Sequence, residues 1–399
     1  MKLLAKTVIV TDGMNRKALT AVRALGTEGY QVVVGETQTQ YPAKWSRYVR
    51  TAITYPDPAA DPEGFVTSLI DAAARFGATI LMPMDDEAVI ALARYSTQLP
   101  NSLNVALPSL ESLRITRDKA ETMSFARALG VPVPESCAPT SVDELERFMA
   151  EVPGPYVFKP RVGSGSRGLD FPKSAGALRD LYLSSNSGSS NAPLVQSRIP
   201  QGRKMHVCFL YDKGRLIASF TQEILRQFPA KGGPGTFWVT AQDAETERYT
   251  RTMFDELNWH GIGMAEFVQH ADTGTWYLME INPRFWNTLA LSVHAGINFP
   301  YLLAKLAEGS PVDAQSLVPK AMYCEWFFPG DLLNWLTSKA DRRMRPGHFA
   351  WIRGSAQGMP IRHVIWDRQD PWPLVGMLAT LLRFVFSRDK WRHAIFRRP

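Results

Sequence analysis

The run Glu280-Ile281-Asn282-Pro283-Arg284 closes an apolar strand pattern that begins at Trp276. A second apolar strand pattern, residues 263–268, lies just before it and carries Glu266 in its interior. The turn signal at residues 272–274, Asp-Thr-Gly, predicts that the two strands form an antiparallel hairpin. The hairpin therefore holds a glutamate inside each of two neighbouring strands, which is an unusual position for a charged side chain.

A carboxylate within an apolar strand is costly unless it has a partner. Glu266, Glu280 and the amide of Asn282 together form an oxygen cluster of the kind that Mg²⁺ prefers. The alternative is a pair of buried salt bridges, for instance to Arg284. The sequence thus predicts either a metal site or a structural ion-pair cluster at this hairpin.

A lysine-bearing strand followed by a glycine- and serine-rich loop occupies residues 156–168. The strand ends at Lys159, which can act as a point charge on a phosphate. The loop residues that can offer backbone N–H groups or hydroxyls to phosphate oxygens are Gly163, Ser164, Gly165, Ser166 and Gly168. The loop lacks a GK[ST] ending and the βαβ context of a dinucleotide fingerprint. The pattern favours a nucleotide-phosphate loop, with a plain hairpin as the alternative.

The N-terminal part of the chain has the rhythm of an α/β domain. The expected elements are strands at residues 7–10, 31–34 and 78–83 and a helix at residues 18–25. This order predicts a parallel sheet with right-handed crossovers. Asp85, Asp86 and Glu87 follow the last of these strands, where they serve either a functional site at the sheet edge or the start of a helix.

Lys159 with its loop, then Glu266 and then the run 280–284, resembles the ATP-grasp superfamily. More narrowly, the chain resembles the carboxylate–amine ligases that share a core with carbamoyl phosphate synthetase and biotin carboxylase. The likeness extends to a helix expected from residue 115 to 129, which carries Lys119, and to a hinge strand at residues 194–200.

This resemblance implies an α/β and α+β fold, in which a Rossmann-like (pre-ATP-grasp) parallel sheet precedes a two-lobed ATP-grasp domain. The implied division is a first domain at residues 1–115, an ATP-grasp domain at 116–310 with a mobile ATP-binding lobe at about 130–200, and a C-terminal extension at 311–399.

The resemblance also implies a role for each matching residue. Lys119 and Lys159 bind the ATP phosphates, and the loop from Gly163 to Gly168 closes over them. The hinge residues that contact adenine are Gln196, Ser197, Arg198 and Ile199. The ligands of one or two Mg²⁺ ions, which Mn²⁺ can replace, are Glu266, Glu280 and Asn282. Arg284 steadies the acyl phosphate, so that Arg284 and Lys159 are the expected catalytic cations.

Two positions depart from the family pattern, and one further segment concerns the substrate. The family often has a glutamate at Ser197 and an acidic ribose partner at Lys204, so the departure leaves ribose binding without its usual partner. Residues 222–233 resemble the segment that faces the acceptor substrate. Arg226 could grip a carboxylate with Lys231 assisting, whereas the alternative is a basic surface loop.

Composition places the chain among ordinary globular proteins. It has 399 residues, of which 45% are hydrophobic and 21% charged, enough for two or three packed lobes. No segment reaches the roughly 18 apolar residues that cross a bilayer. The cysteines Cys137, Cys208 and Cys324 have no CxxC spacing, which predicts neither a zinc site nor a disulfide framework and favours a reducing cytoplasm.

The formal charge of +7 is concentrated at the C-terminus, where residues 383–399 hold six Lys or Arg against one Asp. An apolar segment, residues 374–386, precedes them. This tail suits an amphipathic helix on anionic lipid at the inner face of the membrane, but it equally suits a cap on the fold or a homodimer contact. The remaining charge is nearly balanced, which argues against a dedicated nucleic-acid partner.

The sequence thus predicts a cytoplasmic ATP- and Mg²⁺-dependent ligase that activates a small-molecule carboxylate and couples it to an amine. One alternative is a nucleotide-binding scaffold without turnover, since the acidic residues that usually bind ribose are missing. Another is a membrane-associated partner in glycan or lipid assembly.

Overall fold

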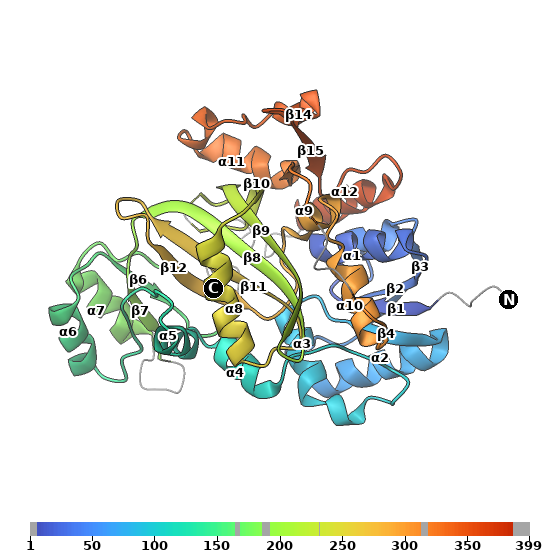
Figure 1. Cartoon of the computed structure of the whole chain (residues 1–399), viewed down its shortest axis with the longest axis horizontal. Helices are drawn as coiled ribbons and strands as arrows, with labels where there is room; N and C mark the ends of the chain where they lie inside the picture. The colour runs from blue at the N-terminus through green and yellow to red at the C-terminus, as the bar shows by residue number, and fades with distance from the viewer. Residues whose placement is uncertain (1–5, 164–167, 186–191, 231, 313–317, 386–399) are drawn as a thin grey trace.

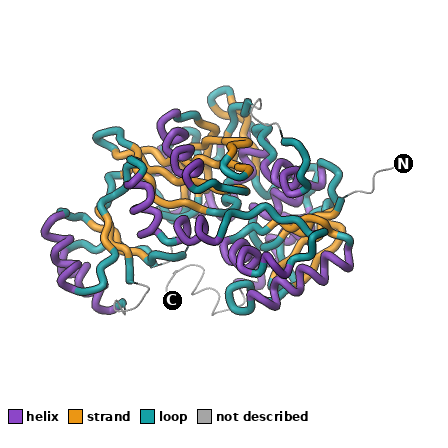
Figure 2. Tube along the Cα trace, turned by 60° about the horizontal axis from the view of Figure 1, so that its bottom comes forward, coloured by secondary structure: helices purple, strands orange, loops and turns teal. Residues whose placement is uncertain are grey.

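The computed structural model describes residues 6–163, 168–185, 192–230, 232–312 and 318–385 (Figure 1). The N-terminal unit and a small lobe occupy opposite ends of the long axis, with a large curved sheet between them (Figures 1 and 2). The C-terminal extension, residues 318–385, packs against the large sheet and the N-terminal unit.

The N-terminal unit is a four-stranded parallel sheet in the order β3-β2-β1-β4. Its strands are β1 (Thr7–Val10), β2 (Gln31–Glu36), β3 (Val49–Thr54) and β4 (Ala78–Met82). Its helices are α1 (Arg16–Thr27), α2 (Pro62–Phe76) and α3 (Asp86–Arg94). The apolar strands are buried on both faces, as a doubly covered parallel sheet requires. The Rossmann-like sheet expected from the sequence is therefore confirmed.

The helix expected as one element from residue 115 to 129 is wrong, because the chain forms two helices. These are α4 (Leu110–Arg117) and α5 (Lys119–Ala128). Asp118 between them is extended, and its side chain accepts hydrogen bonds from the N–H groups of Ala120 and Glu121. Asp118 is thus the N-cap of a new helix, and this cap gives Lys119 a position in its first turn.

The small lobe packs two helices on a three-stranded antiparallel sheet of order β5-β7-β6. Its elements are β5 (Ser136–Cys137), α6 (Val142–Glu151), β6 (Tyr156–Lys159), α7 (Ala175–Ser184) and β7 (Leu194–Ser197). Leu145, Phe158, Leu178 and Val195 form its core, which is separate from the main one.

The large sheet has eight strands in the order β12-β11-β8-β9-β10-β13-β15-β14. The strands are β8 (Gln201–Asp212), β9 (Arg215–Gln227), β10 (Gly235–Ala241), β11 (Gly261–His270), β12 (Trp276–Asn282), β13 (Tyr323–Glu325), β14 (Ser355–Ala356) and β15 (Met359–His363). Helix α8 (Ala244–Glu256) lies across it, and α9 (Leu289–His294) and α10 (Phe299–Ala307) link it to the N-terminal unit (Figure 1). The hairpin predicted around Glu266 and Glu280 is β11 and β12.

The C-terminal extension includes α11 (Leu332–Thr337) and ends its described part with α12 (Trp372–Val385). Just before α12, the buried carboxylate of Asp370 accepts hydrogen bonds from Arg23 Nε, Ser46 Oγ and the Arg47 N–H group. Gly376 lets α12 approach closely, because a Cβ there would lie 2.4 Å from the ring of Trp45. Among the described residues, no helix is both long enough and apolar enough to cross a bilayer.

Candidate active site

The two glutamates of the β11–β12 hairpin stand directly opposite each other on neighbouring strands. Glu266 pairs with Glu280 in the antiparallel register. Asn282, at the end of β12, donates from Nδ2 to Oε1 of both glutamates at 3.1 Å. Burial, followed by the charge of Glu280, raises the pKa of Glu266 to about 8. Among the described residues, neither glutamate forms an ion pair with a lysine or arginine, and burial beside Glu280 favours the protonated form of Glu266.

This cluster is chemically suited to a divalent cation. Mg²⁺ prefers oxygen ligands and commonly takes one or two carboxylates from the protein, with phosphate and water oxygens completing its shell. Glu266 and Glu280 supply carboxylates, and rotation of the Asn282 amide would present its oxygen. In the described part of the chain, no three His, Cys, Asp or Glu side chains gather at one point, so a metal here would depend on ligands from a bound nucleotide.

Lys159 ends β6 of the small lobe with only 8% of its surface exposed. Burial lowers its pKa to about 8, while the charge of Glu280 acts in the opposite direction. The influence of Glu280 indicates that the lysine of one lobe and the carboxylates of the other face the same space. The charges of Lys159 and of the two glutamates therefore act on one another across the two lobes.

Lys119 is held against the loop that follows Lys159. Its Nζ donates to the carbonyl of Gly163 at 2.8 Å, and its backbone N–H donates to the carbonyl of Arg161. Arg161 in turn forms two hydrogen bonds to Asp118, at 3.0 and 2.6 Å. Gly163 has a φ of 134°, a conformation that favours glycine. Helix α5 and the start of the loop therefore form one hydrogen-bonded unit.

The rest of the predicted phosphate loop is only partly described. Ser164, Gly165 and Ser166 lie outside the described residues. Gly168 follows them with a φ of 69°, and a Cβ there would lie 2.8 Å from Pro160. Both described ends of the loop thus depend on glycine.

The hinge leaves one backbone donor for a nucleotide. Gln196 is buried on β7 and donates to Ser136 Oγ, while the N–H groups of Ser197 and Arg198 donate to the carbonyls of Glu135 and Pro155. Arg198 also stacks on Phe171 at 5.0 Å. Within the described structure, the N–H group of Ile199 has no hydrogen-bond acceptor. Of the four predicted hinge residues, Ile199 therefore offers the free backbone N–H group that adenine recognition requires.

Arg284 lies just beyond Asn282 and connects the site to the N-terminal unit. Its Nε donates to Asp86 Oδ2 at 2.8 Å and lies 3.2 Å from Asp85 Oδ1. Although burial opposes the charged form, Asp86 and Asp85 keep the pKa of Arg284 above its ordinary value. Asp85 also caps α3, so the helix-start interpretation of these acids holds, and Asp85 and Asp86 in addition pair with Arg284.

Arg226 does not lie with this group. It belongs to β9, two strands away from β11, and its guanidinium is 1% exposed. It forms a bidentate ion pair with Asp331, donates to the carbonyl of Pro346 and stacks on Phe237 at 4.1 Å. In this structure it joins the C-terminal extension to the large sheet. Lys231, predicted to assist it, lies outside the described residues.

Three polar residues beside the site were not assigned a role from the sequence. His206 on β8 stands opposite Glu266, with its Nε2 3.7 Å from Glu266 Oε2, and burial lowers its pKa to about 3. Lys204, two residues earlier on the same strand, donates to Gln227. Lys17 is buried on α1 and donates to Asp85 and to the carbonyl of Phe285. The alternation of Lys204 and His206 with apolar neighbours was an available signal that both face the carboxylates.

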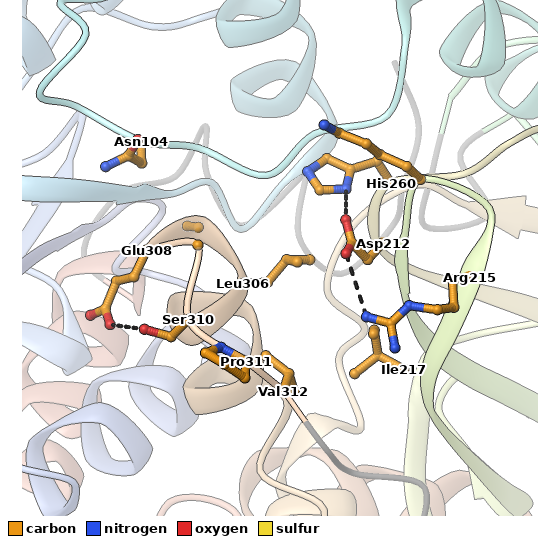
Figure 3. Close-up of a pocket in the computed structure, with 13 residues that line it drawn as sticks. Asn104, Asp212, Arg215, Ile217, His260, Leu306, Glu308, Ser310, Pro311 and Val312 are labelled. Carbon is orange, nitrogen blue, oxygen red and sulfur yellow. Dashed lines mark hydrogen bonds and ion pairs between the residues drawn. The ribbon is translucent and has the colours of Figure 1, made fainter.

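A cavity of about 520 Å³ lies elsewhere, between the β8–β9 turn and the end of α10 (Figure 3). Figure 3 shows Asp212 between His260 and Arg215, at 3.5 and 3.6 Å, and Ser310 beside Glu308. None of the residues predicted for the nucleotide, metal or substrate lines this cavity. The described site is therefore the space between the small lobe and the β11–β12 hairpin.

Comparison with known proteins agrees with this arrangement. Residues 207–326 match the family model described as ATP-grasp in the biosynthetic pathway with Ter operon. This segment contains Glu266, Glu280, Asn282 and Arg284.

Solved structures match over most of the chain. Biotin carboxylase from Campylobacter jejuni, in complex with an ATP analogue, has a TM-score of 0.67 at 17% identity, covering 80% of this chain and 74% of that one. The biotin carboxylase domain dimer of 2-oxoglutarate carboxylase from Hydrogenobacter thermophilus, in complex with MgADP, ADP and bicarbonate, has a TM-score of 0.65 at 18% identity, with coverages of 80% and 74%.

A third match is N5-carboxyaminoimidazole synthetase from Staphylococcus aureus complexed with ADP. Its TM-score is 0.61 at 14% identity, and the match covers 77% of this chain and 79% of that one. At such identities the likeness establishes the fold. The family model and the fold together confirm the resemblance inferred from the sequence: residues 207–326 resemble an ATP-grasp family model, and the chain has the fold of biotin carboxylase and N5-carboxyaminoimidazole synthetase.

Proposed function

We propose that this protein is an ATP- and Mg²⁺-dependent ligase that joins a carboxylate to an amine. A carboxylate oxygen of the substrate attacks the γ-phosphorus of ATP, and ADP leaves. The amine then attacks the acyl carbon of the mixed anhydride, and phosphate leaves with the C–O electron pair. The amine proton passes to phosphate or water, so no redox partner is needed.

The observation that carries this proposal is that the charges of Glu280 and Glu266, a cross-strand pair, act on the buried Lys159 of the other lobe. Phosphoryl transfer depends mainly on positioning and charge neutralisation. A buried lysine from one lobe and two opposed carboxylates from the other suit a magnesium-bound triphosphate. We assign the metal to Glu266, Glu280 and Asn282, where it would shield the phosphate charge.

The other assignments follow from position. Lys119 and the loop from Gly163 to Gly168 bind phosphates, and the hinge at residues 196–199 binds adenine. Arg284, fixed by Asp86, faces the acyl phosphate and is the second catalytic cation beside Lys159. Arg226 is left out, because its guanidinium is already paired with Asp331.

The direct test is ADP release by the pure protein with Mg-ATP and pools of carboxylic acids and amines. Release that depends on one acid and one amine would identify the reaction and its substrates.

Glu280→Gln should lower turnover at least about a hundredfold without loss of the fold, because a carboxylate beside the triphosphate is removed. Glu256→Gln, an exposed glutamate on α8, is the matched control. Normal turnover by Glu280→Gln would show that the site is misplaced.

A non-catalytic ATP-binding scaffold is the second candidate, and the presence of Lys204 where the family has an acidic ribose partner favours it. ATP binding without turnover across broad substrate pools would support the scaffold.

We also propose that the protein works in the cytoplasm as a homodimer and touches the inner membrane face through α12. The membrane contact is supported by the apolar side chains that α12 exposes: the exposed fraction is 59% for Trp372 and 58% for Leu382.

A further inference from the structure

An apolar pocket of about 300 Å³ lies in the C-terminal extension. It borders β13, which is separated from the metal-site strand β11 by β8, β9 and β10. Its aromatic lining consists of Trp326, Phe327, Phe328, Trp351 and Trp366. Trp366 is 50% exposed, so the pocket reaches the surface on that side. The proposed ligase chemistry uses none of these residues.

Two titratable side chains line this pocket, Glu325 and His363, and burial favours the neutral form of each. Glu325 is 1% exposed, and neither of its carboxyl oxygens accepts a hydrogen bond. Burial, followed by the charge of Asp331, raises its pKa to about 9, and a protonated Glu325 can donate to Asp331. Burial also lowers the pKa of His363, whose Nδ1 lies 3.9 Å from Glu325 Oε2. The pocket therefore offers an uncharged, mostly aromatic surface, which suits a neutral apolar group better than a cation.

Helix α12 separates this pocket from the outside. Its inner face contributes Leu374 and Met377 to the lining. Among the described side chains of α12, those exposed on its outer face are apolar and recur at helical spacing, namely Trp372, Val375, Leu378, Ala379 and Leu382. One face of α12 thus lines the apolar pocket, and the opposite face is an apolar outer surface. The helix lies near β15 in Figure 1.

Charge indicates what covers this outer face. The last 17 residues of the sequence, 383–399, follow the apolar stretch of α12 and hold six Lys or Arg against one Asp. An exposed apolar helix beside a basic cluster is the combination that binds anionic lipid, with the two signals reinforcing each other. A second copy of the chain would place these like charges near one another, which disfavours a dimer at this face.

We propose that the pocket beneath α12 binds the hydrocarbon chain of a lipid drawn from an anionic membrane. The inference rests on the proposed membrane contact and extends it: the outer face of α12 lies in the headgroup region, and one chain enters between Trp366 and the inner face of α12.

The pocket can be tested without a membrane, by titrating the full-length protein with straight-chain alcohols of increasing length. Affinity should rise about fourfold for each added CH₂ until the pocket is filled. Trp366→Ala should weaken decanol binding about tenfold, because a half-exposed wall is lost, and Met377→Phe should shorten the longest chain accepted. Leu378→Ser, on the outer face of the same helix, should leave decanol binding unchanged.

Two results would overturn the pocket assignment. One is that no alcohol binds the wild-type protein; the other is that decyltrimethylammonium binds more tightly than decanol, which would indicate an aromatic cage for cations. Membrane contact is tested separately with vesicles of anionic or neutral lipid, where Leu378→Ser should lower binding to the anionic ones. Alcohol binding without vesicle binding would refute the membrane as the source of the chain while leaving the chain site in place.

Discussion

At the scale of single residues, the buried carboxyl group of Glu325 should make the stability of the fold depend on pH. Its pKa is raised from the usual 4.5 to about 9, mainly by burial and then by Asp331. The folded state therefore holds a proton that the unfolded state releases. The contribution of Glu325 to stability is complete below pH 4.5 and is lost as the pH rises toward 9, at up to about 1.4 kcal/mol per pH unit.

Glu325→Gln should remove this part of the pH dependence, because glutamine keeps the shape and cannot ionise. Urea unfolding at two pH values between 4.5 and 9 measures it: the free energy of unfolding should fall less with pH in the variant than in the wild type. Glu256→Gln, at an exposed site, should follow the wild type. Equal pH slopes for Glu325→Gln and the wild type would mean that Glu325 is ionised in the folded protein.

Residue types in the site could be predicted from the sequence, but partners distant in sequence could not. Two glutamates inside apolar strands indicate by themselves that something must compensate them. Arg226 gave no comparable signal, since its partner Asp331 lies 105 residues further along the chain. In the sequence, a basic residue near a glycine turn is equally typical of a substrate site and of a buried ion pair. Only the fold shows which partner lies beside it.

At the scale of elements, the break between α4 and α5 positions Lys119. Asp118 caps α5 and forms a bidentate ion pair with Arg161, so it holds the helix start against the phosphate loop. The pattern Asp118-Lys119-Ala120-Glu121 is a capping-box signal and could have revealed this start from the sequence. The apolar periodicity across residues 110–129 concealed it.

Asp118→Ala should cost about 1 kcal/mol of stability from the lost cap and raise the KM for ATP about tenfold, because Lys119 loses its fixed position. Steady-state kinetics with varied ATP, beside thermal unfolding, separates the two effects. Ser174→Ala is the matched control, since Ser174 caps α7 in the same lobe without touching the loop. If both variants lose stability but neither changes the KM, Asp118 acts only on the helix.

At the scale of the whole molecule, the C-terminal extension is held to the N-terminal unit by Asp370. Replacing Asp370 by alanine leaves Arg23 largely buried without its carboxylate and removes the acceptor of Ser46. We expect a loss of about 3 kcal/mol and faster proteolysis around α12. Asp367→Ala, three residues earlier and partly exposed, should have little effect in both assays. Unchanged proteolysis of Asp370→Ala would mean that packing alone, such as Gly376 on Trp45, holds α12.

The α/β rhythm and the lysine–glycine–glutamate order predicted the sheet and the site, because each depends on local patterns. The assembly of the units depends on single contacts such as Asp370 with Arg23, which are 347 residues apart. No periodicity encodes such a contact, so the sequence left the role of the tail open among a membrane helix, a cap and a dimer contact. Helix α12 does pack on the N-terminal unit, and the described side chains of its outer face are exposed.

The N-terminal unit also reaches the candidate active site, through Asp86. Its carboxylate holds the Nε of Arg284 at 2.8 Å, although the two residues are 198 positions apart.

Asp86→Asn weakens a charge-assisted hydrogen bond to a neutral one, so Arg284 should lose its fixed direction toward the acyl phosphate. Because we assign ATP chiefly to the small lobe, we expect kcat to fall by about tenfold or more while the KM for ATP stays within about twofold. The neighbouring Glu87→Gln, which loses only an exposed pair with Arg117, should keep both constants. A rise in KM with unchanged kcat would instead place Arg284 on the bound nucleotide, and equal constants for Asp86→Asn and the wild type would make the link purely structural.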